Sequence, residues 1–401
     1  DIRITGGYIT ATKATGNAAA IGSGGGGSAA GANAKIEITG GTVIASNQGA
    51  LGVAIGAGGL SSTAASPGIT AGKADIVISG GTVAAYAASK NAISGGYNET
   101  AKDYAATTVQ INGGSVTGTI TGTPTADGTT EVQQTAVTLK SNGTPQADIA
   151  VDAFTLSSGA YGANDVKTDE NGKLFLWLPV GTAVTTAQAG IYAFAGSVAS
   201  GGSGDLTNGT VVFDLANGPV VLGADYSGKD SAGGDVAGAH NESNYYIIKQ
   251  SNPETATTNT VTFAGDGLSF QVVLDNINVD RIFTNTGDDN NRATDSSIYI
   301  PAYPGAEKHV TLYLSGENKL NTICYYTIDD DSRGTGEGRS ASTLKITSAA
   351  GDGKQDGSLA IDATKKGRFS CIGATGDKST ATGLTIAGGT ITAKNSGAEA
   401  C

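Results

Sequence analysis

The sequence predicts an all-β protein made of right-handed parallel β-helix (β-solenoid) segments with a small inserted antiparallel β domain. Three observations predict this class. Apolar and polar residues alternate over four to five positions, which is the period of a strand. Glycine supplies 62 of the 401 residues, and the apolar residues show no helical 3.6-residue spacing. A glycine-rich phrase also recurs along the chain, as in repeat architectures.

The recurring phrase reads apolar-x-apolar-small-Gly-Gly-small-apolar. Its copies occupy residues 2–9, 36–43, 76–83, 109–116 and 384–391. A second phrase, such as Ala54-Ile55-Gly56, follows each of the first three copies, and it returns at Cys371-Ile372-Gly373. The first four copies are 33–40 residues apart, which is the length of one solenoid coil with three short strands. Identical positions in successive coils should then stack about 4.8 Å apart.

Each Gly-Gly pair lies between two expected strands, apolar-x-apolar and Thr-Val-x-Ala. The backbone must turn there with φ > 0, which glycine adopts without steric cost. A β-branched residue is strongly disfavoured in that conformation, so Gly41 and Gly81 should be intolerant of substitution. The Gly24–Gly27 run belongs to a segment of variable length and is expected to be a solvent loop.

The pattern divides the chain into three segments. Residues 1–135 form an N-terminal β-solenoid, and residues 204–401 form a C-terminal one. Residues 136–203 lose the repeat and contain the single tryptophan, Trp177. We expect a small β-sandwich-like insert there, with a continuous thickened coil as the alternative. The last coil stops at Cys401, where an Ile-Gly phrase should follow, and methionine is absent. The chain is therefore expected to be a truncated piece of a longer protein.

The charge pattern bears on the class of partner. The net charge is −12, from 36 acidic and 24 basic residues. An acidic chain without a Lys/Arg cluster is a poor partner for nucleic acid or an anionic membrane surface. No stretch approaches about 18 consecutive apolar residues, so membrane insertion is not expected. Divalent-cation binding is the functional alternative to an acidic surface that only confers solubility.

Few residues are available for catalysis. The two histidines, His240 and His309, are far apart, and the sequence has no nucleophilic-serine or zinc motif. We therefore expect no enzyme activity and assign no catalytic residue. Arg333 and Arg339 follow an acidic run closely. Pectin-cleaving β-helix enzymes use either paired carboxylates for general acid–base work or calcium with an arginine that abstracts a proton. Charge balance within a loop is the more ordinary role of these two arginines.

The acidic run itself is the candidate metal site. Asp329, Asp330 and Asp331 follow an expected strand that ends at Thr327–Ile328. Calcium takes about six to eight oxygen ligands, and three aspartates beside a neighbouring coil's loop could supply half of them. The candidate cofactor is therefore calcium. A solvated acidic loop is the alternative interpretation.

The cysteines test the repeat alignment. Cys371 and Cys401 occupy the repeat position of Ala54, one coil apart. Their side chains should stack inside the core with Cα atoms about 5 Å apart, as buried free thiols. A disulfide across the ladder is the alternative. Cys324 precedes the matching phrase at 327–328 and should lie off this ladder.

Two segments carry a family resemblance. Val-Leu-Asp-Asn-Ile-Asn-Val at 273–279 and Val-Thr-Leu-Tyr-Leu-Ser-Gly-Glu-Asn-Lys-Leu at 310–320 resemble the clostridial carbohydrate-binding β-helix family, best over residues 205–401. The Gly-Gly coils resemble repeat regions of large surface proteins of Gram-positive, clostridial-type bacteria. The resemblance implies a non-catalytic β-helix that binds plant-wall glycans such as cellulose or pectin, with calcium in the fold. It also implies an extracellular protein, secreted or at the cell surface.

We therefore expect a non-enzymatic extracellular β-solenoid of a bacterial surface protein, acting as an adhesin or a glycan-binding stalk. Its partner would be a cell-wall or plant polysaccharide. Two alternatives stay open: a polysaccharide lyase or glycoside hydrolase on a β-helix, and a self-associating structural filament subunit. Half of the tyrosines available for glycan contact should be core or ladder residues. These tyrosines are Tyr245, Tyr246, Tyr299, Tyr303, Tyr325 and Tyr326.

Overall fold

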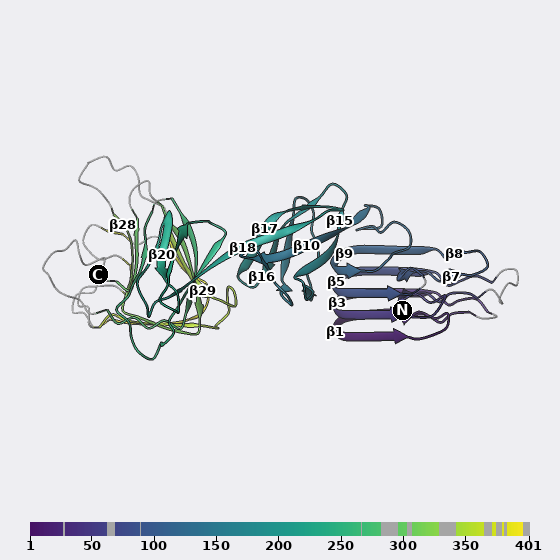
Figure 1. Ribbon diagram of the computed structural model, residues 1–401, viewed down its shortest axis with the longest axis horizontal. Helices are drawn as coiled ribbons and strands as arrows, with labels where there is room; N and C mark the ends of the chain where they lie inside the picture. The colour runs from purple at the N-terminus through teal and green to yellow at the C-terminus, as the bar shows by residue number, and fades with distance from the viewer. Residues whose placement is uncertain are drawn as a thin grey trace. The chain divides into compact units, whose positions relative to one another are not determined.

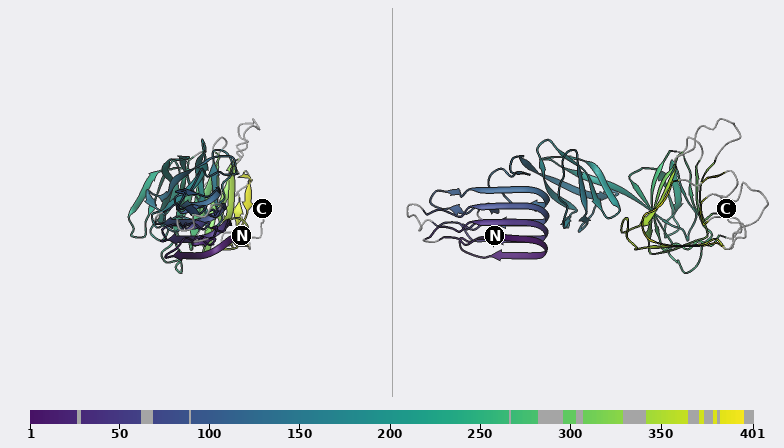
Figure 2. Two further views of the ribbon diagram at one scale, coloured as in Figure 1. Left: turned by 90° about the vertical axis from the view of Figure 1, so that its right-hand side faces the viewer. Right: turned by 180° about the vertical axis from the view of Figure 1, so that it is seen from behind.

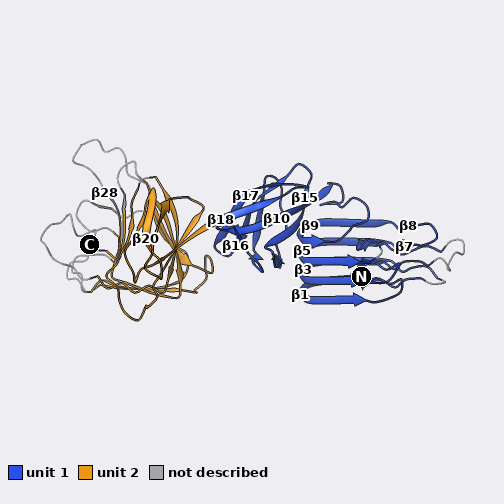
Figure 3. Cartoon of the chain, viewed as in Figure 1, with its two compact units in different colours: residues 1–208 blue, residues 209–401 orange. Residues whose placement is uncertain are grey.

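The structure is all-β. The computed structural model describes residues 1–26, 29–61, 69–88, 90–265, 267–281, 296–302, 307–328, 342–364, 371–373, 379–380 and 383–395 (Figure 1). Every regular element in these ranges is a β-strand, which confirms the all-β part of the expectation. The chain divides into two compact units, Asp1–Asn208 and Gly209–Cys401 (Figure 3). The expected boundaries near residues 135 and 203 stay predictions.

Unit 1 begins with parallel ladders formed by the repeat. The strands are β1 (Ile2–Lys13), β2 (Ile21–Gly22), β3 (Ala34–Asn47), β4 (Ile55–Gly56), β5 (Ala74–Ala87), β6 (Ile93–Ser94) and β9 (Thr107–Thr117), with the small hairpin β7 (Tyr97–Asn98) and β8 (Asp103–Tyr104). The long strands stack in the order β1-β3-β5-β9, and the Ile-Gly phrases stack as β2-β4-β6 (Figure 2). Equivalent repeat positions pair, as Ile36 does with Ile76, and both side chains are buried.

The corner glycines, which are the pairs 6–7, 40–41, 80–81 and 113–114, bend each long strand. The second glycine of each pair has φ between 85° and 87°, as the sequence predicts. The strands expected on either side of the corner are one continuous strand. Pairing resumes beyond the bend after a shift of register, because glycine lets the backbone turn without ending the ladder.

The Gly24–Gly27 run is not a uniform solvent loop. A Cβ atom at Gly24 would meet nothing within 4 Å. A Cβ atom at Gly25 would lie 2.4 Å from the carbonyl carbon of Asn17, and one at Gly26 would lie 2.0 Å from the carbonyl oxygen of Ala29. The expectation is therefore wrong for Gly26, which is buried and forms a bridge to Leu60. Gly25 is exposed, but other backbone packs closely against it. Gly27 lies outside the described residues.

The rest of unit 1 is a mostly antiparallel module. Its strands are β10 (Val132–Ser141), β11 (Thr144–Pro145), β12 (Ala150–Val151), β13 (Ala153–Leu156), β14 (Val166–Lys167), β15 (Lys173–Pro179), β16 (Ala183–Ala189), β17 (Tyr192–Ala199) and the first half of β18 (Ser203–Asp214). Strand β15 alternates between two cores. Leu174, Leu176 and Leu178 are buried inside the module, whereas Trp177 packs against the core of the parallel ladders. This alternation places the module directly on the repeat coils.

Residues 161–167, here called the clamp segment, lie along the corner glycines. Three backbone N–H groups donate to it: Gly41 N to Asp165 Oδ2 at 3.0 Å, Gly81 N to the Asn164 carbonyl at 2.6 Å, and Gly114 N to the Gly162 carbonyl at 2.9 Å. A Cβ atom at Gly40 would lie 2.7 Å from Asp165 Oδ2. The first glycine of a corner pair thus leaves room for the clamp segment, while the second supplies the positive φ.

In unit 2, parallel ladders of strands enclose a large hydrophobic core. Its further strands are β19 (Val220–Leu222), β20 (Asp225–Lys229), β21 (Asp235–Ala239), β22 (Asn244–Lys249), β23 (Val261–Phe263), β24 (Ser269–Asp275), β25 (Ile298–Ala302), β26 (His309–Ser315), β27 (Glu317–Leu320), β28 (Ile323–Ile328), β29 (Thr343–Ser348), β30 (Ser358–Asp362), β31 (Ile372–Gly373), β32 (Ser379–Thr380), β33 (Leu384–Ile386) and β34 (Thr390–Lys394). The parallel ladders are β18-β22-β24-β26-β29-β33, β19-β23-β25-β28-β31 and β27-β30-β34. Side chains from all three ladders contribute to the core. The hairpin β20–β21 pairs antiparallel with β19.

The expected register near Cys324 is wrong, because Ile323 rather than Ile328 pairs with Ile372. Cys324 pairs with Gly373, two positions beyond Cys371, so it lies in the same sheet but not at the Cys371 position. The shift arises because β28 begins three residues after β27 ends, earlier than the phrase at 327–328 suggests. Cys324 is buried and Cys371 is half-buried, and both are free thiols. Cys401 lies outside the described residues, so its distance from Cys371 stays a prediction.

Candidate functional site

The candidate calcium ligands Asp329, Asp330 and Asp331 lie outside the described residues, as do Arg333 and Arg339. In the ranges that the structure describes, no group of three or more His, Cys, Asp or Glu side chains could hold a metal ion. Over the same ranges, no helix is long and apolar enough to cross a membrane.

The two histidines of unit 2 differ in their surroundings. His240 Nδ1 is 2.6 Å from the Tyr246 hydroxyl, and its ring lies 4.6 Å from that of Phe270. Burial lowers the pKa of His240, so it is a neutral member of an aromatic cluster at pH 7. His309 is exposed at the start of β26, with Nδ1 3.0 Å from Thr343 Oγ1.

Among the six tyrosines considered for glycan contact, the structure describes four side chains, of which three are buried and Tyr299 is half-buried. Tyr245, Tyr246 and Tyr325 are at most 6% exposed. Burial raises the pKa of Tyr325 to about 12, and its hydroxyl donates to the Ser342 carbonyl at 2.5 Å. Tyr303 and the side chain of Tyr326 lie outside the described residues. Buried rings of this kind support the fold and are not available to a ligand.

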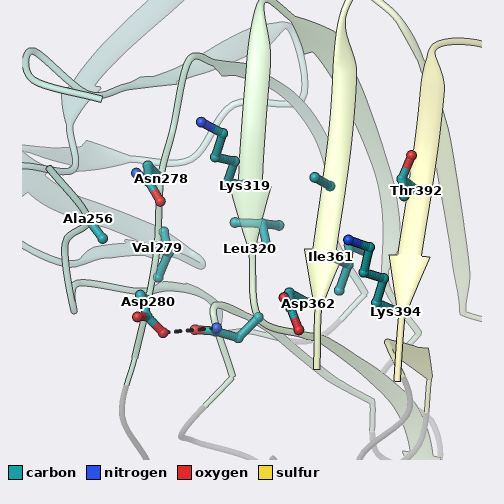
Figure 4. Close-up of a pocket in the computed structure, with 12 residues that line it drawn as sticks. Ala256, Asn278, Val279, Asp280, Lys319, Leu320, Ile361, Asp362, Thr392 and Lys394 are labelled. Atoms are coloured by element: carbon teal, nitrogen blue, oxygen red, sulfur yellow. Dashed lines mark hydrogen bonds between the residues drawn. The ribbon is translucent and has the colours of Figure 1, made fainter. Parts of the chain in front are cut away.

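An open groove runs across the ladder β27-β30-β34 of unit 2 (Figure 4). Its volume is about 360 Å³. We call it the charged groove, because two lysines and two aspartates line it together with amides and a hydroxyl. The lining residues are Ala256, Asn278, Val279, Asp280, Lys319, Leu320, Asn321, Ala360, Ile361, Asp362, Thr392 and Lys394.

Strand alternation supplies the floor of the charged groove. In β30, Leu359 and Ile361 enter the core, while Asp362 faces outward. The register pairs Asp362 with Lys394 on the next strand. Lys319 occupies an outward position on β27. Neighbouring strands are about 4.8 Å apart, so outward side chains on successive strands lie close to one another across the ladder. These side chains include both positively and negatively charged groups.

The buried amide of Asn321 and the half-buried amide of Asn278 fix the wall of the charged groove. Asn321 Nδ2 donates to Asp280 Oδ1 at 3.1 Å, while Asn321 Oδ1 accepts from the Arg281 backbone N–H at 2.7 Å. Asn278 Nδ2 donates to the Pro253 carbonyl at 2.8 Å. These bonds hold the loop that carries Asp280 before any ligand arrives. Such preorganisation lowers the entropic cost of binding.

None of the groove residues is predicted as a site from the sequence. The predicted metal site is an acidic run in one loop, whereas the charged groups of the groove come from strands and a loop far apart in the sequence. The signal was present in the alternation of polar and apolar residues at 317–320, 358–362 and 390–394. Alternation identifies an outward face but does not show which faces are hollowed.

Comparison of the chain with protein-family models, with curated proteins and with solved structures finds no match. The charged groove therefore has to be interpreted from its own chemistry.

Proposed function

We propose that the protein is a non-enzymatic extracellular β-solenoid of a bacterial surface protein of the Gram-positive type, which binds glycan as an adhesin or stalk. The finer fold assignment, a right-handed parallel β-helix, is part of this proposal. It is supported by ladders in which equivalent positions of successive coils pair in parallel. A stack of coils of this kind contacts mainly its neighbours and extends in one direction.

The observation that carries the glycan proposal is the charged groove. It is open and crosses successive strands. Asp362 and Lys394 are paired on neighbouring strands, and Lys319 and Thr392 lie on either side of Ala360. A polymer that carries hydroxyl and carboxylate groups along its length fits polar groups spread across the strands in this way. Lys319 and Lys394 would contact acidic sugars, and Asp280, Asp362 and Thr392 would contact hydroxyls.

Full-length protein titrated calorimetrically with oligogalacturonate, with and without calcium, tests this proposal. We expect the double variant Lys319→Ala/Lys394→Ala to bind at least about tenfold more weakly, a loss of about 1.4 kcal/mol. Lys354→Ala is the matched control, because Lys354 is exposed in unit 2 and is not one of the groove-lining residues. Glycan binding is refuted if no member of a plant-wall and cell-wall glycan panel binds with a Kd below about 1 mM.

The second candidate function is a polysaccharide lyase or glycoside hydrolase, because Asp280 and Asp362 both line the groove. Paired carboxylates perform general acid–base chemistry on glycosidic bonds. Release of reducing ends or unsaturated uronides from the same panel would identify an enzyme. That release should disappear in Asp280→Asn and Asp362→Asn.

A further inference from the structure

Unit 1 contains a second pocket, of about 440 Å³, where the repeat coils meet the antiparallel module. Strands β5 and β9 supply one side, and β10 and β15 supply the other. We call it the neutral pocket, because none of the described residues that line it carries a formal charge. The lining residues are Ala85, Tyr86, Ala87, Ala92, Thr117, Gly118, Thr119, Gln134 and Phe175.

A difference in strand length creates the neutral pocket. Ala84 of β5 pairs with Thr117, the last residue of β9, whereas β5 continues to Ala87. At Gly118 the backbone takes φ 136° and leaves the ladder. The end of β5 therefore has no neighbour above it from β9. The space left over is bounded by the module.

The far wall of the pocket is held in place by contacts to β9. Gln134 Nε2 and Trp177 Nε1 both donate to the Val116 carbonyl at 3.0 Å, and the Phe175 backbone N–H donates to Ser115 Oγ at 2.9 Å. The pocket is thus preformed by the docking of the module, and it needs no rearrangement to admit a ligand.

Two aromatic rings and several polar groups define what the pocket can hold. Tyr86 is 58% exposed, which is a large exposure for an aromatic side chain, and Phe175 is half-buried opposite the coils. Thr117 and Thr119 supply hydroxyls, and Gln134 supplies an amide. Aromatic faces pack against apolar C–H surfaces while hydroxyl and amide groups form hydrogen bonds. A pyranose ring presents both kinds of surface. An acidic sugar would place a carboxylate where the lining has no positive charge.

We propose that the neutral pocket is a second glycan site, selective for uncharged pyranose chains. This inference rests on the proposed function in that the ligand is a glycan. It differs in its location, in unit 1, and in its ligand class, because the charged groove suits acidic chains. The Tyr86 ring stacks on one sugar, and the Phe175 side bounds the other face of the chain.

The test is calorimetric titration of the full chain with three neutral probes, cellohexaose, xylohexaose and mannohexaose. Removing a stacked ring should weaken binding of the bound probe at least about tenfold in Tyr86→Ala and in Phe175→Ala. Tyr86→Phe keeps the ring and should stay within about threefold of wild type. Tyr8→Ala is the matched control, because Tyr8 is an exposed tyrosine on the same sheet, 72% exposed, and is not part of the lining.

The fluorescence of Trp177, the single tryptophan, offers a local second readout, because its indole shares the Val116 carbonyl with the pocket residue Gln134. The emission should change during titration with the bound neutral probe, and this change should be lost in Tyr86→Ala. The circular dichroism spectrum and melting temperature of Phe175→Ala show whether a loss of binding reflects misfolding. Tyr86→Ala removes an exposed side chain and supplies the test if Phe175→Ala is unstable.

The outcomes separate the two sites. The second site is established if three results are obtained together: a neutral probe binds to wild type, Tyr86→Ala abolishes that binding, and Lys319→Ala/Lys394→Ala does not. If oligogalacturonate binds but no neutral probe does, the second site is refuted and the charged groove stands. If a neutral probe binds equally to wild type, Tyr86→Ala and Phe175→Ala, the neutral pocket is not its site. If nothing binds, both proposals fail.

Discussion

Alanine substitution at three glycines of unit 1 separates the conformational demand of the corners from their steric demand. Gly7 and Gly41 are equivalent corner positions with the same φ of 87°. A Cβ atom at Gly41 would lie 2.7 Å from backbone atoms of Gly6 and Gly7, whereas one at Gly7 would meet nothing within 4 Å. Gly24 also faces open space, and its φ lies outside the left-handed region. Gly24→Ala should therefore add neither backbone strain nor steric overlap, Gly7→Ala should add backbone strain alone, and Gly41→Ala should add both.

The expected magnitudes follow from these contacts. A left-handed backbone costs a non-glycine residue about 1–2 kcal/mol, so Gly7→Ala should destabilise unit 1 by that amount. Gly41→Ala should add about 1–3 kcal/mol for forcing a methyl group into packed backbone, giving about 2–5 kcal/mol in all. Gly24→Ala should stay within about 0.5 kcal/mol of wild type.

Differential scanning calorimetry of the full chain measures the effect on the melting transition of unit 1. Each kcal/mol lowers the melting temperature by about 2–4 °C for a domain of this size. Gly41→Ala should therefore melt about 2–12 °C below Gly7→Ala. Gly114→Ala is a further check, because its φ is 86° and its Cβ atom would lie 2.8 Å from the Gly81 carbonyl oxygen.

Equal melting temperatures for Gly24→Ala and Gly41→Ala would refute the assignment of the corners. Equal losses for Gly7→Ala and Gly41→Ala would instead show that strain alone matters and that the packing between successive corners contributes nothing measurable. A stable Gly41→Val would contradict both parts of the reasoning, because a β-branched residue is disfavoured at φ > 0.

Three further predictions concern single groups. Tyr161 is buried, and its hydroxyl donates to the Gly114 carbonyl and accepts from the Trp177 backbone N–H. Tyr161→Phe should therefore lower the free energy of unfolding of unit 1 by about 1–3 kcal/mol, measured by urea unfolding. An unchanged urea midpoint would count against the docking of the module on the parallel ladders. Burial depresses the pKa of His240. Below a pH of about 6.5, the ordinary pKa of histidine, the unfolded chain therefore binds a proton more readily than the folded chain does, and the folded state loses stability. The melting temperature of unit 2 should decrease as the pH is lowered from 7.5 to 5, and it should decrease less in His240→Phe. The same dependence of melting temperature on pH in both proteins would contradict this prediction. If residues 329–331 bind calcium, chelator should lower the same melting temperature by mass action, whereas identical curves would favour a solvated loop.

The local features of the fold were accessible from the sequence, because each depends on a few neighbouring residues. Alternation predicted the strands, and the Gly-Gly phrase predicted the positive φ at Gly7, Gly41, Gly81 and Gly114. Exact repetition also predicted which residues pair, since a one-residue slip would turn every apolar side chain to the opposite face. Where repetition was imperfect, as near Cys324, the register was wrong by five residues, because Ile323 rather than Ile328 pairs with Ile372.

The candidate sites were decided only by tertiary structure. The charged groove joins Asn278, Lys319, Asp362 and Lys394 from strands and a loop far apart in the sequence, and no local pattern in the sequence marks the place where these elements leave a hollow. The neutral pocket depends on β9 ending earlier than β5 and on the module docking above it. The clamp segment brings Asp165 to a backbone N–H that lies 124 positions earlier in the chain. Such contacts depend on how whole elements pack against one another, and a short-range sequence pattern carries no information about that packing.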